Sequence, residues 1–128
     1  MIFFADRAEV RFDTRMDWQD DHRFLKTAFD TSIFTDYARF EVQFGNVKRP
    51  TARNTTVEQA KFEVLNHKYT DLSESRYGAA LLNDCKYGIS VEGGQMRLSL
   101  HKGGCRPDYK GDHACTIASM PSCHIRRL

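Results

Sequence analysis

The sequence predicts an all-β domain, built as an antiparallel β-sandwich. Three observations support this class: apolar and polar residues alternate along several segments, two such segments flank a Gly-Gly pair, and no segment keeps a helical apolar stripe over three turns. The chain has 128 residues, of which 41% are hydrophobic and 28% charged. This length and composition fit one globular domain with its own core.

Period-two alternation marks the strands that we expect, in chain order. The alternating segments are 9–13, 38–44, 61–64 and 95–100. Because successive side chains of a strand point to opposite faces, each segment is expected to have one apolar and one solvated face. In the second segment, the predicted apolar face consists of Ala38, Phe40, Val42 and Phe44. Residues 79–82 are apolar on both faces, which indicates a strand in the middle of a sheet.

A hairpin is predicted near the end of this pattern. Residues 89–92 and 95–98 alternate on either side of Gly93-Gly94. A two-residue glycine loop tolerates positive φ, which is what a tight turn between antiparallel strands requires.

Helical and loop signals are weak. Residues 17–22 and 56–61 are each long enough for a short helical turn, and neither continues further. The segment 49–56 has the composition of a loop, and its Pro50 cannot donate a hydrogen bond to a neighbouring strand.

Charge and hydropathy exclude two classes of partner. The formal net charge is +2, and the positive excess belongs to residues 101–128. The basic side chains of this segment are too sparse for a nucleic-acid surface. The longest aliphatic run is 79–82, too short to cross a membrane. Residues 1–5 lack a basic start and are followed at once by charged residues, so no secretory signal is predicted. We therefore expect a cytoplasmic protein, with free thiols.

The sequence predicts neither a metal site nor a catalytic motif. The cysteines and histidines of the tail lie at irregular intervals and form no C-x-x-C pair; they are Cys105, Cys115, Cys123, His101, His113 and His124. No nucleophile elbow, phosphate loop or H-E-x-x-H motif occurs.

One polar cluster is the candidate binding site. It follows the apolar run 79–82 and consists of Asn83, Asp84, Lys86 and Tyr87. At a strand end, such groups can present hydrogen-bonding atoms and a flat aromatic ring to a sugar. They can equally form a β-turn in which Asn and Asp bond to their own backbone, and composition alone favours the turn.

Several segments between about residue 8 and residue 100 keep a characteristic order and spacing. They are Asp17-Trp18 with 22–26, Arg49-Pro50-Thr51 with Asn54-Thr55, then 60–64, 67–69, 71–74, 81–88 and 96–100. In this order they resemble the C-terminal β-domain of glycoside hydrolase family 38 α-mannosidases, above all the cytosolic or vacuolar and bacterial branch. Ala52 and Val57 stand where that family commonly has His and Trp. The similarity weakens after residue 100, and the ending 121–128 is unlike the family.

The resemblance implies a partial β-sandwich, truncated on its N-terminal side, over residues 1–120, followed by a divergent tail at 121–128. Family members are retaining enzymes that hydrolyse terminal α-D-mannosides, and their zinc and nucleophile belong to an N-terminal domain. The chain is thus expected to hold no cofactor and no catalytic residue, and to be inactive alone.

The resemblance also implies partners for the chain. These are α-mannoside oligosaccharides, bound through the full enzyme, and the missing catalytic domain. Apolar strand faces or sheet edges left uncovered would promote self-association. The implied location is cytoplasmic, with a vacuolar one as the alternative. A stand-alone β-sandwich that binds carbohydrate or protein without catalysis remains the second hypothesis.

Overall fold

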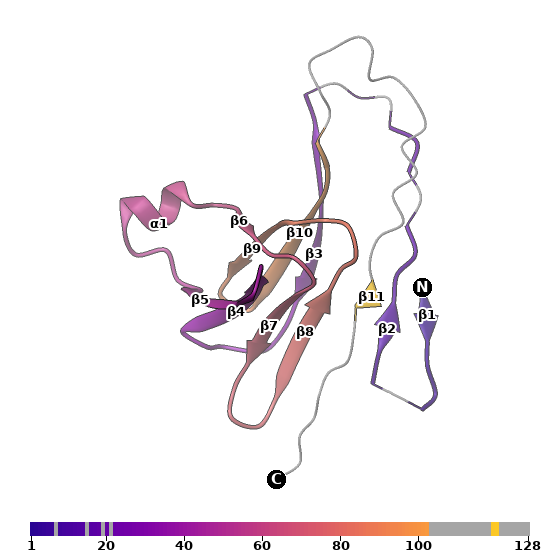
Figure 1. Cartoon of the computed structure of the whole chain (residues 1–128), viewed down its shortest axis with the longest axis horizontal. Coiled ribbons are helices and arrows are strands. Elements are labelled where there is room, and N and C mark those ends of the chain that lie inside the picture. Colours follow the sequence, from indigo (N-terminus) through magenta and orange to yellow (C-terminus); the bar gives the residue numbers. More distant parts are fainter. Residues whose placement is uncertain (7, 15, 19, 21, 103–118, 121–128) are drawn as a thin grey trace.

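A computed structural model describes residues 1–6, 8–14, 16–18, 20, 22–102 and 119–120 (Figure 1). Within them, two four-stranded antiparallel sheets share one apolar core, so the predicted all-β sandwich is confirmed. A small ladder of two-residue strands lies on one side of this sandwich, and the short helix lies on the opposite side (Figure 1).

Each sheet is assembled from hairpin neighbours and from strands distant in the sequence. The first has the order β3 (Phe24–Asp30), β10 (Gln95–Lys102), β9 (Gly88–Glu92) and β6 (Val64–Leu65). The second has the order β5 (Gly45–Pro50), β4 (Tyr37–Val42), β7 (Tyr69–Ser73) and β8 (Gly78–Leu82). The small ladder consists of β1 (Ile2–Phe3), β2 (Val10–Arg11) and β11 (Ser119–Met120). The helix α1 spans Thr56–Ala60.

The core confirms the alternation in two strands. Met96, Leu98 and Leu100 of β10 are buried and alternate with half-buried polar residues. Ala38 and Phe40 of β4 are buried in the same core. Residues of both sheets complete the core: Ile33, Leu72, Leu81, Ile89 and Val91.

The predicted hairpin is confirmed as β9–β10. Glu92 pairs with Gln95 across a turn in which Gly93 has a φ of 56°. Gly94 is needed for a different reason, close packing: a Cβ atom there would lie 2.5 Å from the carbonyl oxygen of Thr31. Both glycines are therefore required by geometry.

The predicted strand 38–44 is too long. β4 ends at Val42, and Phe44 belongs to the two-residue turn that leads to β5, where its φ is 64° and its side chain is fully exposed. The next strand, β5, extends to Pro50, so the predicted loop begins at Thr51. Pro50 is tolerated because β5 is an edge strand.

Three other predictions need correction. The segment 61–64 forms a strand only at β6, and Phe62 lies outside it with 58% of its surface exposed. The run 79–82 lies in β8, which ends the order of its sheet instead of occupying the middle; β8 also contacts β11. No helix includes the described residues of 17–22.

The helical turn predicted at 56–61 is confirmed as α1, one residue shorter. None of the helices in the described residues is long and apolar enough to cross a membrane.

Candidate functional site

The predicted polar cluster lies where two turns meet at one end of the sandwich. The turn between β6 and β7 contributes residues 66–68, and the turn between β8 and β9 contributes 83–87. Two backbone hydrogen bonds of 2.9 Å connect them: the N–H of Asn66 donates to the carbonyl of Tyr87, and the N–H of Asn83 donates to the carbonyl of Lys68. This pairing connects the two turns side by side.

Asn83 closes the second turn. Its side-chain Oδ1 accepts a hydrogen bond of 2.9 Å from the backbone N–H of Lys86, and the residue is only 6% exposed. This is the geometry that makes Asn a turn residue. Asn83 therefore acts as a turn residue, as the β-turn alternative predicted.

The other three residues of the cluster are more accessible. Asp84 is exposed, Lys86 is half-buried, and Tyr87 is 52% exposed. The Tyr87 ring contacts the His67 ring edge-on, with 5.5 Å between centroids. A carboxylate, an ammonium group and a supported phenol ring are thus available to a ligand on this surface.

Buried polar atoms without partners lie beside these turns. Among the described residues, no hydrogen bond reaches Nδ2 or Oδ1 of Asn66, Oγ1 of Thr70 or Nδ2 of Asn83. Asn66 and Thr70 are fully buried. Thr70 pairs with Leu81, and Asn83 lies two residues beyond Leu81, so Thr70 and Asn83 face the same side of their sheet. An unpaired buried polar atom costs free energy, so these three residues differ from Thr51 and Ser90, the other buried polar residues of the described part of the chain.

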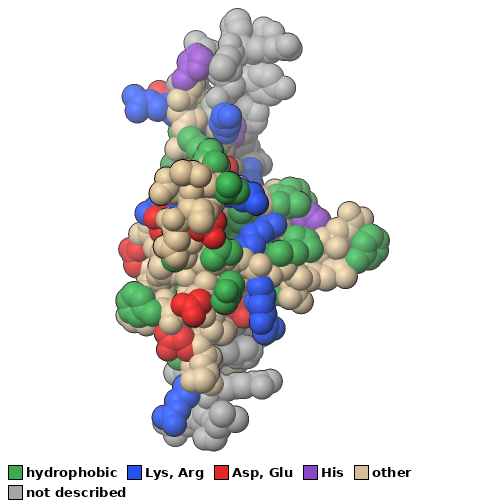
Figure 2. All heavy atoms as spheres, turned by 90° about the vertical axis from the view of Figure 1, so that its left-hand side faces the viewer, with side chains coloured by type: hydrophobic (Ala, Val, Ile, Leu, Met, Phe, Trp, Pro, Cys, Tyr) green, Lys and Arg blue, Asp and Glu red, His purple; other side chains and the backbone are tan. Residues whose placement is uncertain are grey.

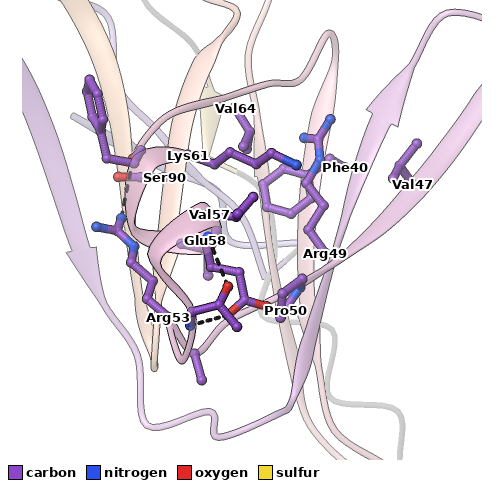
Figure 3. Close-up of a pocket in the computed structure, with 14 residues that line it drawn as sticks. Phe40, Val47, Arg49, Pro50, Arg53, Val57, Glu58, Lys61, Val64 and Ser90 are labelled. Atoms are coloured by element: carbon purple, nitrogen blue, oxygen red, sulfur yellow. Dashed lines mark hydrogen bonds between the residues drawn. The ribbon is translucent and has the colours of Figure 1, made fainter.

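A cavity of about 480 Å³ lies on the side of the molecule where α1 covers the gap between the sheets (Figure 3). Edge strand β5, strand β9 and α1 form its walls. Its lining among the described residues consists of Phe40, Val47, Arg49, Pro50, Ala52, Arg53, Thr55, Val57, Glu58, Lys61, Phe62, Val64, Ser90 and Val91. Basic, acidic and apolar side chains are mixed on this face of the molecule (Figure 2).

Arg49 is the central cation of this cavity. Its guanidinium stacks over the Phe40 ring at 5.0 Å, and its Nη1 donates a hydrogen bond of 2.8 Å to the carbonyl of Leu65. Partial burial lowers the pKa of Arg49 from its usual value. Its partners are a ring and a carbonyl, neither of which neutralises the charge.

A capping box fixes the helix that covers the cavity. Thr55 accepts a hydrogen bond of 3.2 Å from the backbone N–H of Glu58, and the Glu58 carboxylate accepts one of 2.9 Å from the backbone N–H of Thr55. The backbone hydrogen bonds from Thr55 and Asn54 lower the pKa of Glu58. A Thr three residues before a Glu is a recognisable start signal, so this element was detectable in the sequence.

The cavity itself was not predicted, because its lining comes from segments far apart in the chain. The described residues hold no group of three or more His, Cys, Asp or Glu that could bind a metal. The cysteines and histidines of the tail, His101 excepted, lie outside the described residues.

Comparisons with known proteins agree with one another. The family described as "Glycosyl hydrolases family 38 C-terminal domain" matches residues 2–110. The human protein "Alpha-mannosidase 2C1" is 46% identical over 115 residues, which is 88% of the chain. "Alpha-mannosidase G" of Dictyostelium discoideum is 44% identical over 124 residues, or 94% of the chain, and "Alpha-mannosidase" of Saccharomyces cerevisiae is 48% identical over 95 residues, or 74%. The chain spans only 11%, 11% and 9% of these three relatives.

Proposed function

The chain belongs to glycosyl hydrolase family 38, as part of its C-terminal domain, and from this premise we propose that it serves an α-mannosidase. In this proposal the larger enzyme hydrolyses terminal α-D-mannosides of oligosaccharides, and this chain supplies a β-sandwich that completes it. The observation that carries the proposal is the match over residues 2–110, together with the three relatives named above, each of which is an α-mannosidase.

The catalytic chemistry is assigned to the rest of the enzyme. The described residues do not fit the zinc of the family, since they hold no suitable group of ligands. We likewise propose that residues 1–120 belong to the sandwich and that 121–128 form a divergent tail. The enzyme that contains them is proposed to be cytoplasmic or vacuolar.

The polar cluster at the two turns, which we call the turn site (Asn83, Asp84, Lys86 and Tyr87), is proposed to face the catalytic part of the enzyme. Asp84, Lys86 and Tyr87 offer an acceptor, a donor and a ring face, which is a combination suited to sugar hydroxyls. Asn83 positions them, because its Oδ1 holds the N–H of Lys86. The fully buried side-chain amide of Asn66, which has no hydrogen-bond partner among the described residues, lies in the neighbouring turn.

The test compares the isolated chain with an intact family enzyme. The 128-residue chain is expected to release no product from an aryl α-mannoside, with or without zinc. In the intact enzyme, Asp84→Ala and Tyr87→Ala at the aligned positions are expected to lower kcat/KM while leaving Tm nearly unchanged. Lys48→Ala, on exposed β5, is the control and should change neither. Unaltered kcat/KM in both variants would mean that the cluster only forms a β-turn and does not serve the active site.

A stand-alone binding module is the second candidate, and the aromatic pair of His67 and the exposed Tyr87 favours it. Binding of mannose by the isolated chain, lost in Tyr87→Ala, would support this candidate over a purely auxiliary domain.

A further inference from the structure

We propose that the cavity beneath α1 binds a small organic anion, a carboxylate or phosphate ester that carries an apolar body. This inference is independent of the proposed α-mannosidase function, because it uses a different set of residues at a different place in the fold.

The charge balance of the cavity favours an anion. Its lining includes three cations, Arg49, Arg53 and Lys61, and a single carboxylate, Glu58. That carboxylate already accepts two backbone hydrogen bonds at the start of α1. The basic side chains of the lining therefore exceed the acidic ones, even with the charge of Glu58 counted.

Arg49 lacks a neutralising partner in the described part of the chain, and Lys61 is only close enough to Glu58 to help lower the pKa of that carboxyl. Arg49 donates to the carbonyl of Leu65, and Lys61 forms no ion pair within that part. Arg53 is 3.7 Å from Glu92, but this carboxylate is shared with Arg97 at the same distance. A guanidinium whose remaining N–H groups are available binds carboxylate and phosphate oxygens particularly well.

The rest of the lining is apolar and suits a hydrophobic body. Phe40 and Val91 are buried, and Val57 and Phe62 are 61% and 58% exposed at the rim. Val57 points toward the Phe40 ring, with Arg49 beside it (Figure 3). A volume of about 480 Å³ lies within the range of small-molecule sites, which are mostly apolar with a few placed polar groups.

Two small side chains leave this space open. Ala52 and Val57 both line the cavity, at the positions where the family resemblance places a bulkier His and Trp. The same comparison supplies a test, since the larger residues can be introduced to fill the cavity without touching a cation.

Isothermal titration calorimetry on the 128-residue chain tests the proposal with named probes. Phenyl phosphate and benzoate, which separate the two kinds of anion, combine a negative charge with a ring. Inorganic phosphate lacks the ring, and benzyl alcohol lacks the charge. At least one ring-bearing anion is expected to bind about tenfold more tightly than inorganic phosphate or benzyl alcohol.

Variants connect that binding to the cavity. Arg49→Gln and Lys61→Gln are each expected to weaken it by about tenfold, since each removes a charge-assisted hydrogen bond. Lys48→Gln, on the opposite face of β5, loses the same charge and should change the affinity less than about twofold. The double variant Ala52→His with Val57→Trp should abolish binding, with the circular dichroism spectrum unchanged.

Three outcomes would overturn the proposal. They are equal affinity for benzyl alcohol and the anions, undiminished binding in the filled variant, and no binding of either ring-bearing anion. Because Lys61 is exposed and makes no ion pair with a described residue, Lys61→Gln gives a clear answer even if Arg49→Gln does not fold.

Discussion

Thr70→Val is expected to stabilise the isolated chain, against the usual direction of this substitution. Thr70 lies in β7 between Phe40 of β4 and Leu81 of β8, and it is fully buried. Its hydroxyl has no hydrogen-bond partner among the described residues. Valine keeps the β-branched shape, and so it replaces only the hydroxyl with a methyl group.

The magnitude follows from the cost of an unpaired polar group. A buried hydroxyl without a partner costs about 1–3 kcal/mol, and the new methyl group removes that cost. The free energy of unfolding should therefore rise by about 1 kcal/mol or more, which for a domain of this size corresponds to roughly 4 °C in Tm.

Urea unfolding at a constant m-value measures this change. The matched control is Thr70→Ser, which keeps the unpaired hydroxyl and loses the methyl group, and which should lower the free energy of unfolding by about 1 kcal/mol. A Thr70→Val variant less stable than the parent chain would refute the reasoning, because it would mean that the hydroxyl makes a hydrogen bond worth keeping.

Other predictions concern the helix, the hairpin and the sheet edges. Thr55→Ala should cost about 1 kcal/mol in urea unfolding, because the capping box is lost. The pKa of Glu58 in the folded chain lies below the usual 4.5. The ionised carboxylate therefore stabilises the fold above pH 4.5, and this stabilisation is lost as the pH falls through the folded-state pKa. In Glu58→Gln, the free energy of unfolding should depend less on pH in this acid range. Gly94→Ala should destabilise more than Gly93→Ala, since its Cβ would meet the backbone oxygen of Thr31, and equal melting temperatures would contradict this. Light scattering should show self-association that rises with concentration, because β3 and β5 are open sheet edges within the described sheets.

The strands that were predictable are those in which one face meets the core. In β10, period-two alternation is enough to identify Met96, Leu98 and Leu100 as buried, because burial on one side leaves a mark on every second residue. The same rule gave a wrong prediction at Phe44. Its apolar side chain continues the alternation, but it lies in a hairpin turn, and only the pairing of Val42 with Gly45 shows where the strand ends.

The candidate sites differ in how local their signals are. Asn83 and Lys86 are three residues apart, so a turn between them could be predicted from the sequence alone. The cavity under α1 could not, since Arg49, Val57 and Val91 meet there only when both sheets and the helix are in place. Edge position also depends on the complete sheet, which is why the apolar run of β8 wrongly indicated a central strand.

The buried polar residues at the turn site connect stability with the proposed function. Asn66, Thr70 and Asn83 are buried at one end of a core whose other buried members, apart from Thr51 and Ser90, are hydrophobic. Apolar residues of similar shape would stabilise the sandwich, so stability alone does not explain these three positions. Local rules are most often broken where a protein acts, and these residues lie beside the turn that presents Asp84 and Tyr87. A Thr70→Val variant that is more stable alone, yet impairs an intact family enzyme, would show that this end of the sandwich is retained for contact with the rest of the enzyme.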